Sequence, residues 1–226
     1  MSTRTLLELP ILTKLHILDY LGLPDLFSFS LVSSHTKDLV KALNRKVEYC
    51  YWWIDIHDTH NIVLPTFDLE IVKSGFEFLP DNQQYEQMHF NDHIYPIEHG
   101  NYRWYVVDPF KSERYYMDIL EQFSDYILDI FRVQNFKLKA ISEMDYLNLF
   151  VWKHTKKFEY FHLCADILKP DQMKFVLEQL TVKEYWLMET CEDVCEITGP
   201  LTMESMLVEN TDWKRHWKRH WKRLSE

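Results

Sequence analysis

The sequence predicts an α+β fold in which three short N-terminal helices precede a strand-rich segment and a short array of alternating strands and helices. Apolar residues recur at helical spacing over the first 47 residues, and aromatic-rich runs of period two follow them. Farther along, one apolar spacing recurs three times at a nearly constant interval. We therefore divide the chain into four segments, residues 1–47, 48–110, 111–212 and 213–226.

The first predicted helix covers residues 9–21 and is apolar around most of its circumference. At 100° per residue its isoleucines and leucines span an arc of roughly 220°, broken only by Lys14. A surface helix that packs on one side needs an apolar stripe of about 100°. Half of this helix therefore lacks an obvious partner within the segment. The residues of the arc are Ile11, Leu12, Leu15, Ile17, Leu18 and Leu21.

Two further helices are predicted to complete the first segment. Gly22 ends the first helix, and Pro24 suits the first turn of the second, which carries several large apolar residues. Ser33 or Ser34 can cap a third helix that extends to Val47. A unit of about 40 residues buries too little of its surface to be stable alone. The excess apolar surface must be covered, either by later residues of the chain or by a partner protein.

The order of these apolar residues resembles the F-box motif. The matching residues are Leu9-Pro10, Ile17-Leu18, Leu21, Asp25-Leu26 and Val32-Ser33. Leu12 stands where the family usually has an acidic residue, and His35-Thr36 replace a frequent tryptophan. The resemblance implies a three-helix segment that docks on a Skp adaptor, which connects F-box proteins through a cullin to a RING ubiquitin ligase. It implies that the adaptor contacts Leu9, Pro10, Ile17, Leu21, Leu26 and Val32.

Strand-like runs fill the chain from residue 47 to about residue 108, and we expect antiparallel strands there. The runs are "VEYCYWWIDI", "NIVL", "LEIV", "FEFL" and "YRWYVV", and prolines and Gly100 separate them. A long amphipathic helix is predicted over "SERYYMDILEQFSDYILDIFR", with Ser112 as a candidate cap.

The most regular feature of the sequence is the spacing Φ-x-x-Φ-x-Φ, where Φ is a large apolar residue. Its copies start 25 and then 24 residues apart, at Val133/Phe136/Leu138, Phe158/Phe161/Leu163 and Val182/Tyr185/Leu187. Helical segments lie between them, one opened by the capping box "SEMD" at 142–145 and the other by Pro170. A strand and a helix that recur every 20 to 29 residues predict a leucine-rich-repeat-like βα array.

This half of the chain also resembles a known region. The stretch from "KLKAISEMDYLNLF" to "TVKEYWL", followed by "LTMESML", is similar to the F-box-associated region (type two) of the large nematode F-box families. In these families a helix–strand array follows an N-terminal F-box, as the pattern predicts here.

Composition and charge exclude several classes of function. The net charge is −10, and residues 1–213 hold 19 Lys or Arg against 34 Asp or Glu, so we expect no nucleic-acid partner. With only four glycines the chain has no glycine-rich phosphate loop. No stretch approaches the roughly 20 apolar residues of a membrane span, and no secretory signal is evident. Four scattered cysteines favour a reducing compartment, hence an intracellular protein, cytoplasmic or nuclear.

Other candidate sites are weaker. His57, His60, His89, His93 and His99, with Asp92 and Glu98, offer metal-ligand chemistry, but in predicted loops and strand ends without the spacing of a helical metal motif. No hydrolase nucleophile motif occurs, and Cys164 and Cys191 are predicted to be small core residues. The tail "WKRHWKRHWKRLSE" repeats a basic, tryptophan-containing tetrad that suits an anionic surface, although a recent duplication leaves the same pattern.

Together these features predict a substrate-receptor subunit of a cullin-RING (SCF-type) ubiquitin ligase. Its N-terminal helices are expected to bind the Skp adaptor and its C-terminal region an unknown target protein. We expect no catalytic residues, no metal and no cofactor. The alternatives are a protein-interaction module without a ligase role and, less favoured, a metal-dependent enzyme that uses the histidine-rich segment.

Overall fold

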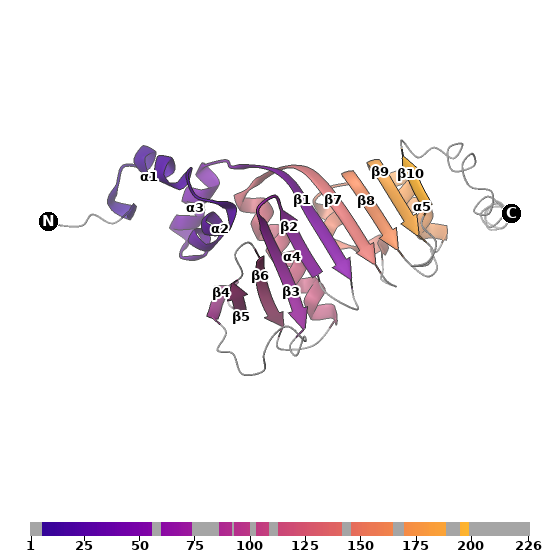
Figure 1. Cartoon of the computed structure of the whole chain (residues 1–226), viewed down its shortest axis with the longest axis horizontal. Helices are drawn as coiled ribbons and strands as arrows, with labels where there is room; N and C mark the ends of the chain where they lie inside the picture. The colour runs from indigo at the N-terminus through magenta and orange to yellow at the C-terminus, as the bar shows by residue number, and fades with distance from the viewer. Residues whose placement is uncertain are drawn as a thin grey trace. The chain divides into compact units, whose positions relative to one another are not determined.

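A computed structural model describes residues 6–55, 60–73, 86–91, 93–99, 103–108, 113–141, 146–164, 170–188 and 195–198 (Figure 1). The chain forms two compact units. Unit 1 comprises residues 1–51 and 58–134, and unit 2 comprises residues 52–57 and 135–226. The N-terminal helices, and the strand-rich sheet that follows them, are both present.

Unit 1 begins with the 3-10 helix η1 (Leu6–Glu8) and the helices α1 (Ile11–Leu18), α2 (Leu23–Leu31) and α3 (Ser34–Ala42). The three predicted helices are confirmed, with shorter bounds. Helix α1 ends at Leu18 rather than at residue 21, because the N–H groups of Tyr20 and Leu21 donate to carbonyls three residues earlier. The prediction that Val47 ends α3 is wrong: Asn44 adopts a φ of 49°, which stops the helix, and Val47 lies in the first strand.

The strands of unit 1 are β2 (His60–Leu64), β3 (Phe67–Lys73), β4 (Glu86–Phe90), β5 (His93–His99) and β6 (Arg103–Asp108), together with most of β1 (Lys46–Asp55). Their order is β1-β2-β3-β6-β5-β4. Strands β2 and β3, β5 and β6, and β4 and β5 pair antiparallel, whereas β3 and β6 pair in parallel, so the expectation of antiparallel strands is wrong for that pair. The connection from β3 to β6 is long enough for a parallel return because it includes the β4–β5 pair.

The segment from His89 to His99 was predicted to form strand ends and loops, but most of it lies in β4 and β5. Asn91 follows β4 with a φ of 46°, a conformation that suits a tight turn. Pro96 lies inside β5, opposite Gln87 of β4. Proline has no backbone N–H to donate. Pro96 is tolerated because β5 pairs with β6 only from Ile97 onward, so no hydrogen bond to β6 is lost at Pro96.

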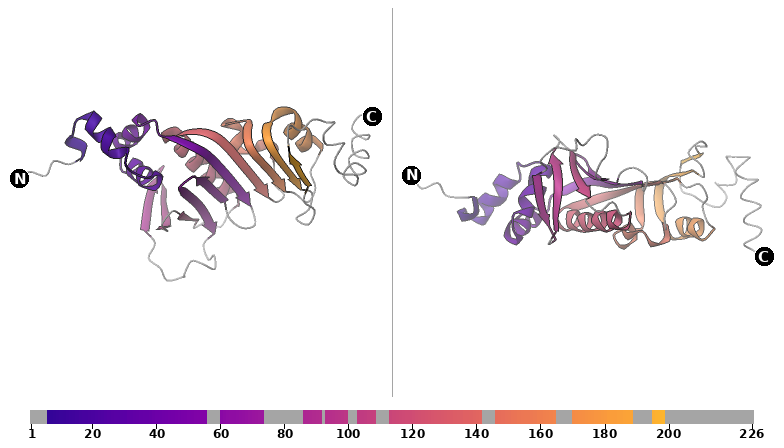
Figure 2. Two further views of the ribbon diagram at one scale, coloured as in Figure 1. Left: turned by 45° about the horizontal axis from the view of Figure 1, so that its top comes forward. Right: turned by 90° about the horizontal axis from the view of Figure 1, so that it is seen from below.

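Helix α4 (Glu113–Ile130) confirms the predicted amphipathic helix and packs along one face of the unit 1 strands (Figure 2). Its inward side chains recur at three- and four-residue steps, as an amphipathic helix requires. Ser112, the predicted cap, lies outside the described residues. The buried apolar residues in the described part of α4 are Ile119, Leu120, Phe123, Ile127 and Ile130.

Unit 2 contains β8 (Lys157–Cys164), β9 (Thr181–Met188) and β10 (Cys195–Thr198), with most of β7 (Arg132–Ile141) and the end of β1. Strands β7, β8 and β9 pair in parallel, and β10 pairs antiparallel with β9. Helix α5 (Pro170–Gln179) joins β8 to β9 as predicted. The helix predicted between β7 and β8 is instead two 3-10 helices, η2 (Tyr146–Asn148) and η3 (Phe150–Lys153), and its capping box lies outside the described residues. A leucine-rich-repeat-like array remains a prediction.

The three copies of the apolar spacing lie on β7, β8 and β9. The second and third are in register, because Phe161 pairs with Tyr185 and Leu163 with Leu187. The first is shifted by two residues, so that Leu138 rather than Phe136 lies opposite Phe161. A shift of two residues keeps every side chain on its own face of the sheet. Leu138 and Ala140 therefore fill the core beside Phe161 and Leu163.

Phe27 of α2 lies at the centre of the unit 1 core. Its ring centroid is 5.1 Å from that of Phe67 on β3, 5.3 Å from Trp104 on β6 and 5.9 Å from Tyr126 on α4. Phe27 is fully buried. The helix that carries it is therefore held by the sheet and by α4 through one aromatic side chain.

Replacing Phe27 with alanine is expected to lower the free energy of unfolding of unit 1 by about 3–5 kcal/mol, the usual cost of emptying a large aromatic site. Urea denaturation followed by circular dichroism measures the loss. Val32→Ala, which truncates an exposed side chain just after the same helix, serves as the matched control and should change stability by less than about 0.5 kcal/mol. Equal effects of the two substitutions would contradict this account of the core.

Candidate functional site

Exposed apolar side chains gather on the N-terminal helices. Six large apolar residues of the described chain are exposed, and five of them lie between residues 11 and 32. Single exposed apolar residues are normal on a soluble protein, but a group of them on one short segment indicates an interaction site. The six, with the exposed fraction of each, are Ile11 (51%), Leu12 (77%), Ile17 (40%), Tyr20 (79%), Val32 (73%) and Ile94 (53%).

Helix α1 faces the core with the side opposite to the one expected of a surface helix. It buries Lys14, which is only 8% exposed, together with Leu18, and it presents Ile11 and Leu12 to the solvent. The aliphatic stem of a lysine can cover apolar neighbours, which makes its burial tolerable. The sequence placed Lys14 as a break in the apolar arc, whereas in the structure it lies on the inward side. The side chains of Ile11 and Leu12, on the outward side of the helix, are exposed.

The predicted adaptor-contacting residues fall into three groups. Pro10, Ile17 and Val32 are exposed, and Leu9 and Leu21 are half-buried. Leu26 is fully enclosed within the described chain, so it supports α2 from beneath and does not reach the surface. An adaptor contact for any of the six stays a prediction.

Three residues of this surface were not among the predicted contacts. Ile11 and Leu12 belong to the apolar arc of the first helix but not to the matched motif positions. Tyr20 follows α1, and its ring lies 5.2 Å from that of His16 in an edge-on contact. The width of the apolar arc could have indicated Ile11 and Leu12 as surface residues. No feature of the sequence indicates Tyr20, a single tyrosine after the helix.

The turns between the helices set the orientation of this surface. Pro10 occupies the N-cap of α1. Gly22, which was predicted to end the first helix, is instead the N-cap of α2, and Pro24 lies in the first turn of α2 as expected. Ser33 caps α3: its hydroxyl accepts from the Thr36 N–H at 3.2 Å, and the Thr36 hydroxyl accepts from the Ser33 N–H at 2.9 Å. The starts of all three helices are thus set by local sequence.

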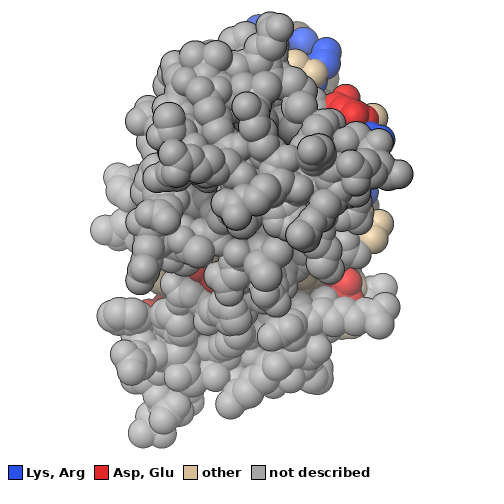
Figure 3. All heavy atoms as spheres, turned by 90° about the vertical axis from the view of Figure 1, so that its right-hand side faces the viewer, with Lys and Arg blue, Asp and Glu red and all other residues tan. Residues whose placement is uncertain are grey.

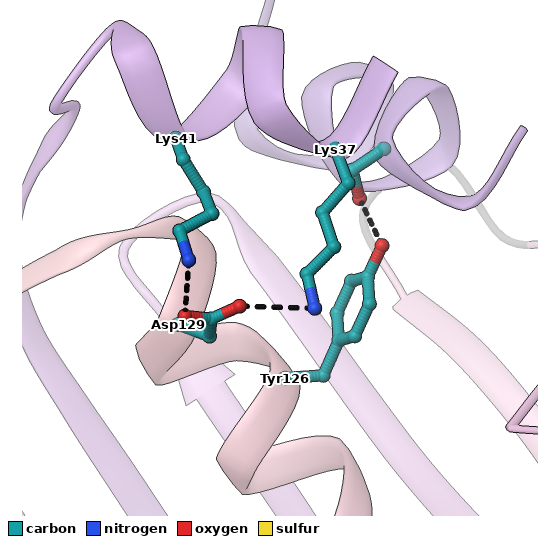
Figure 4. A network of polar contacts seen from close by, with 5 residues as sticks. Lys37, Lys41, Tyr126 and Asp129 are labelled. Carbon is teal, nitrogen blue, oxygen red and sulfur yellow. Dashed lines mark hydrogen bonds and ion pairs between the residues drawn. The ribbon is translucent and has the colours of Figure 1, made fainter. Parts of the chain in front are cut away.

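Polar contacts fasten α2 and α3 to α4 (Figure 4). The Tyr126 hydroxyl donates to the Ser30 hydroxyl at 3.0 Å. Asp129 accepts from Lys41 at 2.6 Å and lies 2.9 Å from the Lys37 ammonium, which is also 4.4 Å from the centre of the Tyr126 ring. One turn of α4, from Tyr126 to Asp129, therefore contacts both helices.

Electrostatics favour this arrangement at neutral pH. Burial raises the pKa of the Asp129 carboxyl, but hydrogen bonds and charges from Lys41 and Lys37 outweigh it and lower the pKa overall. Hydrogen bonding and the charge of Asp129 raise the pKa of Lys41. Burial raises the pKa of Tyr126, so its hydroxyl stays protonated and can donate to Ser30. All three groups therefore keep the protonation states that the contacts require.

The candidate metal ligands are not brought together in the described chain. His60 lies on β2, while His89 lies on β4 and His93 and His99 on β5, and β3 and β6 separate β2 from β5. His57 and Asp92 lie outside the described residues. No group of three potential ligands is found among the residues that the structure describes.

The remaining candidates add no site to the described chain. Burial raises the pKa of the Cys50 thiol, which disfavours the reactive thiolate. Cys164 ends β8, whereas Cys191 and the basic tail from residue 213 lie outside the described residues. None of the described helices is both long enough and apolar enough to cross a membrane.

Comparison with known proteins identifies the N-terminal segment. Residues 6–48 match the family model of the F-box domain. The match covers α1, α2 and α3 and ends at the start of β1, so the three helices fit an F-box, and it supports an F-box protein. No curated protein matches the chain, and no solved structure does.

The contact between α3 and α4 should depend on pH in the acid range. Because the folded state lowers the pKa of Asp129, its contribution is fully present above the ordinary aspartate pKa and is lost as the pH falls from there through the lowered pKa. We expect Asp129→Asn to lower the free energy of unfolding by about 0.5–1 kcal/mol at neutral pH, and the difference to shrink when the pH is brought below the ordinary aspartate pKa of about 3.9.

Urea denaturation at both pH values measures the effect, with Asp118→Asn, an exposed carboxylate on the same helix, as the control. A stability difference for Asp129→Asn that persists unchanged at the acid pH would show that the ion pairs are not its source.

Proposed function

We propose that this protein is a substrate-receptor subunit of an SCF-type ubiquitin ligase. The observation that carries the proposal is the orientation of α1, which buries a lysine and exposes isoleucine and leucine, in a segment that matches the F-box domain. A helix in this orientation gains free energy when a partner covers it. A Skp adaptor is the partner that the F-box match suggests.

The adaptor-binding surface that we propose is broader than the matched motif positions. Its exposed centre contains Ile11, Leu12, Ile17, Tyr20 and Val32, and Pro10, Leu9 and Leu21 lie beside it. Fully burying a side chain of this size contributes about 1.5–3 kcal/mol. Leu26 acts from beneath, by holding α2 in place. A few such anchors are enough to dominate the affinity of a protein interface.

The mechanism in this proposal is proximity. The F-box holds the chain on the adaptor and cullin, and a second surface holds the target protein beside the ubiquitin carrier. The effective concentration of the target near the carrier is raised without any bond being made or broken by this chain. The protein then needs no catalytic residue and no cofactor, and it acts inside the cell.

For the C-terminal half we propose a nematode-type F-box-associated region. The parallel strands β7, β8 and β9, with 3-10 helices and α5 between them, support a repeating βα unit of the expected length. Target binding is assigned to this half because the N-terminal surface is taken up by the adaptor. An interaction module without a ligase role is the alternative, and it predicts that the adaptor is not bound.

Binding of a purified Skp adaptor to the intact chain tests the proposal. We expect Ile17→Asp to weaken binding at least about tenfold, which corresponds to about 1.4 kcal/mol, because a carboxylate would be buried in an apolar interface. Titration calorimetry measures the affinity, and thermal unfolding verifies that the variant stays folded.

Ile94→Asp is the matched control, because Ile94 is also an exposed isoleucine of unit 1 but lies on β5. It should bind the adaptor like the unchanged chain. If the unchanged chain fails to bind, or if both variants bind equally well, the chain is not an adaptor-docked receptor of this kind.

A further inference from the structure

An ion pair joins the end of α1 to the segment between α3 and β1. The Arg45 guanidinium donates to the Asp19 carboxylate at 2.9 Å and to the main-chain carbonyl oxygen of Asp19 at 3.4 Å. Asp19 is the C-cap of α1, and Arg45 lies just before β1. We call this contact the Arg45–Asp19 pair. It connects the helix that carries the exposed isoleucine and leucine side chains to the residue that leads into the sheet.

The Arg45 end of the pair is fixed by its backbone. Asn44 adopts a φ of 49°, in the left-handed region, so the chain turns sharply after α3. The Arg45 carbonyl oxygen then accepts from the N–H of Arg132 at 2.9 Å. Arg132 begins β7 just after α4, and it belongs to unit 1. The position of the Arg45 backbone is therefore set by the core of unit 1.

The Asp19 end of the pair lies where the chain passes from the core to the surface. Leu18 before it is fully buried, whereas Tyr20 after it is exposed. The carbonyl groups at the C-terminal end of a helix lack intrahelical partners and carry a partial negative charge. A guanidinium at this position satisfies one of these carbonyls and also favours the helix end electrostatically.

Few buried side chains hold α1. The helix has eight residues, of which only Lys14 and Leu18 are buried. Among the described elements it packs mainly against α3, which lies beside it in Figure 1. A helix of about two turns is not stable by itself in water. The orientation of α1 therefore depends on a small number of contacts, and the Arg45–Asp19 pair is one of them.

Oppositely charged side chains also lie close together elsewhere on the chain. Basic and acidic side chains are neighbours where described residues are in view in Figure 3. An exposed ion pair adds little to the stability of a whole domain, because water screens it and two side chains must be ordered. The Arg45–Asp19 pair is of this exposed kind, so its effect is expected on one short helix and not on the stability of unit 1.

We propose that Arg45 is a positioning residue for adaptor binding. Through Asp19 it holds α1, and the turn that carries Tyr20, in the orientation that presents the exposed apolar side chains. This inference rests on the proposed receptor function. Arg45 needs no contact with the adaptor in this role. When the pair is broken, only a fraction of the chains keeps α1 in the binding orientation, and the apparent affinity for the adaptor falls by that fraction.

Exchange of the two charges tests the proposal, with titration calorimetry of the full chain against a purified Skp adaptor. Arg45→Asp and Asp19→Arg each place two like charges side by side, so each should weaken binding by at least about fivefold, or about 1 kcal/mol. The double variant restores an ion pair in the reverse order and should bind within about twofold of the unchanged chain. Losses that add in the double variant would show that these residues contact the adaptor directly, and would overturn the proposal.

Lys46→Asp is the control of equal charge change. Lys46 is the next residue, is exposed, and forms no ion pair with the described residues. This variant should bind the adaptor like the unchanged chain. Equal losses for Arg45→Asp and Lys46→Asp would show a general effect of charge and would also overturn the proposal.

Hydrogen–deuterium exchange of the free chain provides a readout that does not involve the adaptor. Arg45→Asp should speed amide exchange in α1 by at least about threefold, whereas α4 should exchange as in the unchanged chain. Unchanged exchange in α1, or faster exchange throughout unit 1, would contradict a positioning role. If the unchanged chain binds the adaptor and Arg45→Asp binds it equally well, only this inference fails. If the unchanged chain does not bind, the receptor function fails as well.

Discussion

The burial of Phe27 is the interaction on which the rest of unit 1 depends. Three short helices cannot form a stable core by themselves, and this chain solves the problem by inserting one aromatic ring of α2 among β3, β6 and α4. Once α2 is anchored in this way, the surface of the helices that faces the strands and α4 is already covered. Helix α1 lies at the end of the segment with only Lys14, Leu18 and the half-buried leucines turned inward, and its isoleucines remain outside.

This arrangement gives the F-box segment two roles that do not compete. Its second and third helices belong to the core of unit 1 and are held there by Phe27 and by the contacts of Lys37 and Lys41 with Asp129. Its first helix keeps Ile11, Leu12 and Ile17 exposed, and we propose that a partner covers them. A protein bound to α1 would therefore be fixed in orientation relative to the strands of unit 1, because the F-box helices and those strands belong to one compact unit. Rigid positioning suits a receptor that acts by proximity.

Much of this could be predicted from the sequence, because local rules decide it. Pro24 and Ser33 mark helix starts that are observed, and the excess of apolar residues in the first helix predicted an exposed surface. Gly22 was predicted to end the first helix, but that helix already ends at Leu18 and Gly22 caps the start of the second. The errors arise where long-range packing decides. Pro96 is accommodated because its strand is paired on one side at that point, and Lys14 faces inward because its stem can cover apolar neighbours. The contact between the Lys139 ammonium and the Trp53 ring of another strand is also one that no local pattern reveals.

Hydrogen–deuterium exchange of the intact chain, with and without a purified Skp adaptor, tests the central claim most directly. The account predicts that the adaptor slows amide exchange in α1 and in the turn that follows it, while β4 and β5, which carry the exposed Ile94, exchange as before. Unchanged exchange in α1 under saturating adaptor, or protection confined to other elements, would contradict the claim that the outward face of α1 is the docking surface.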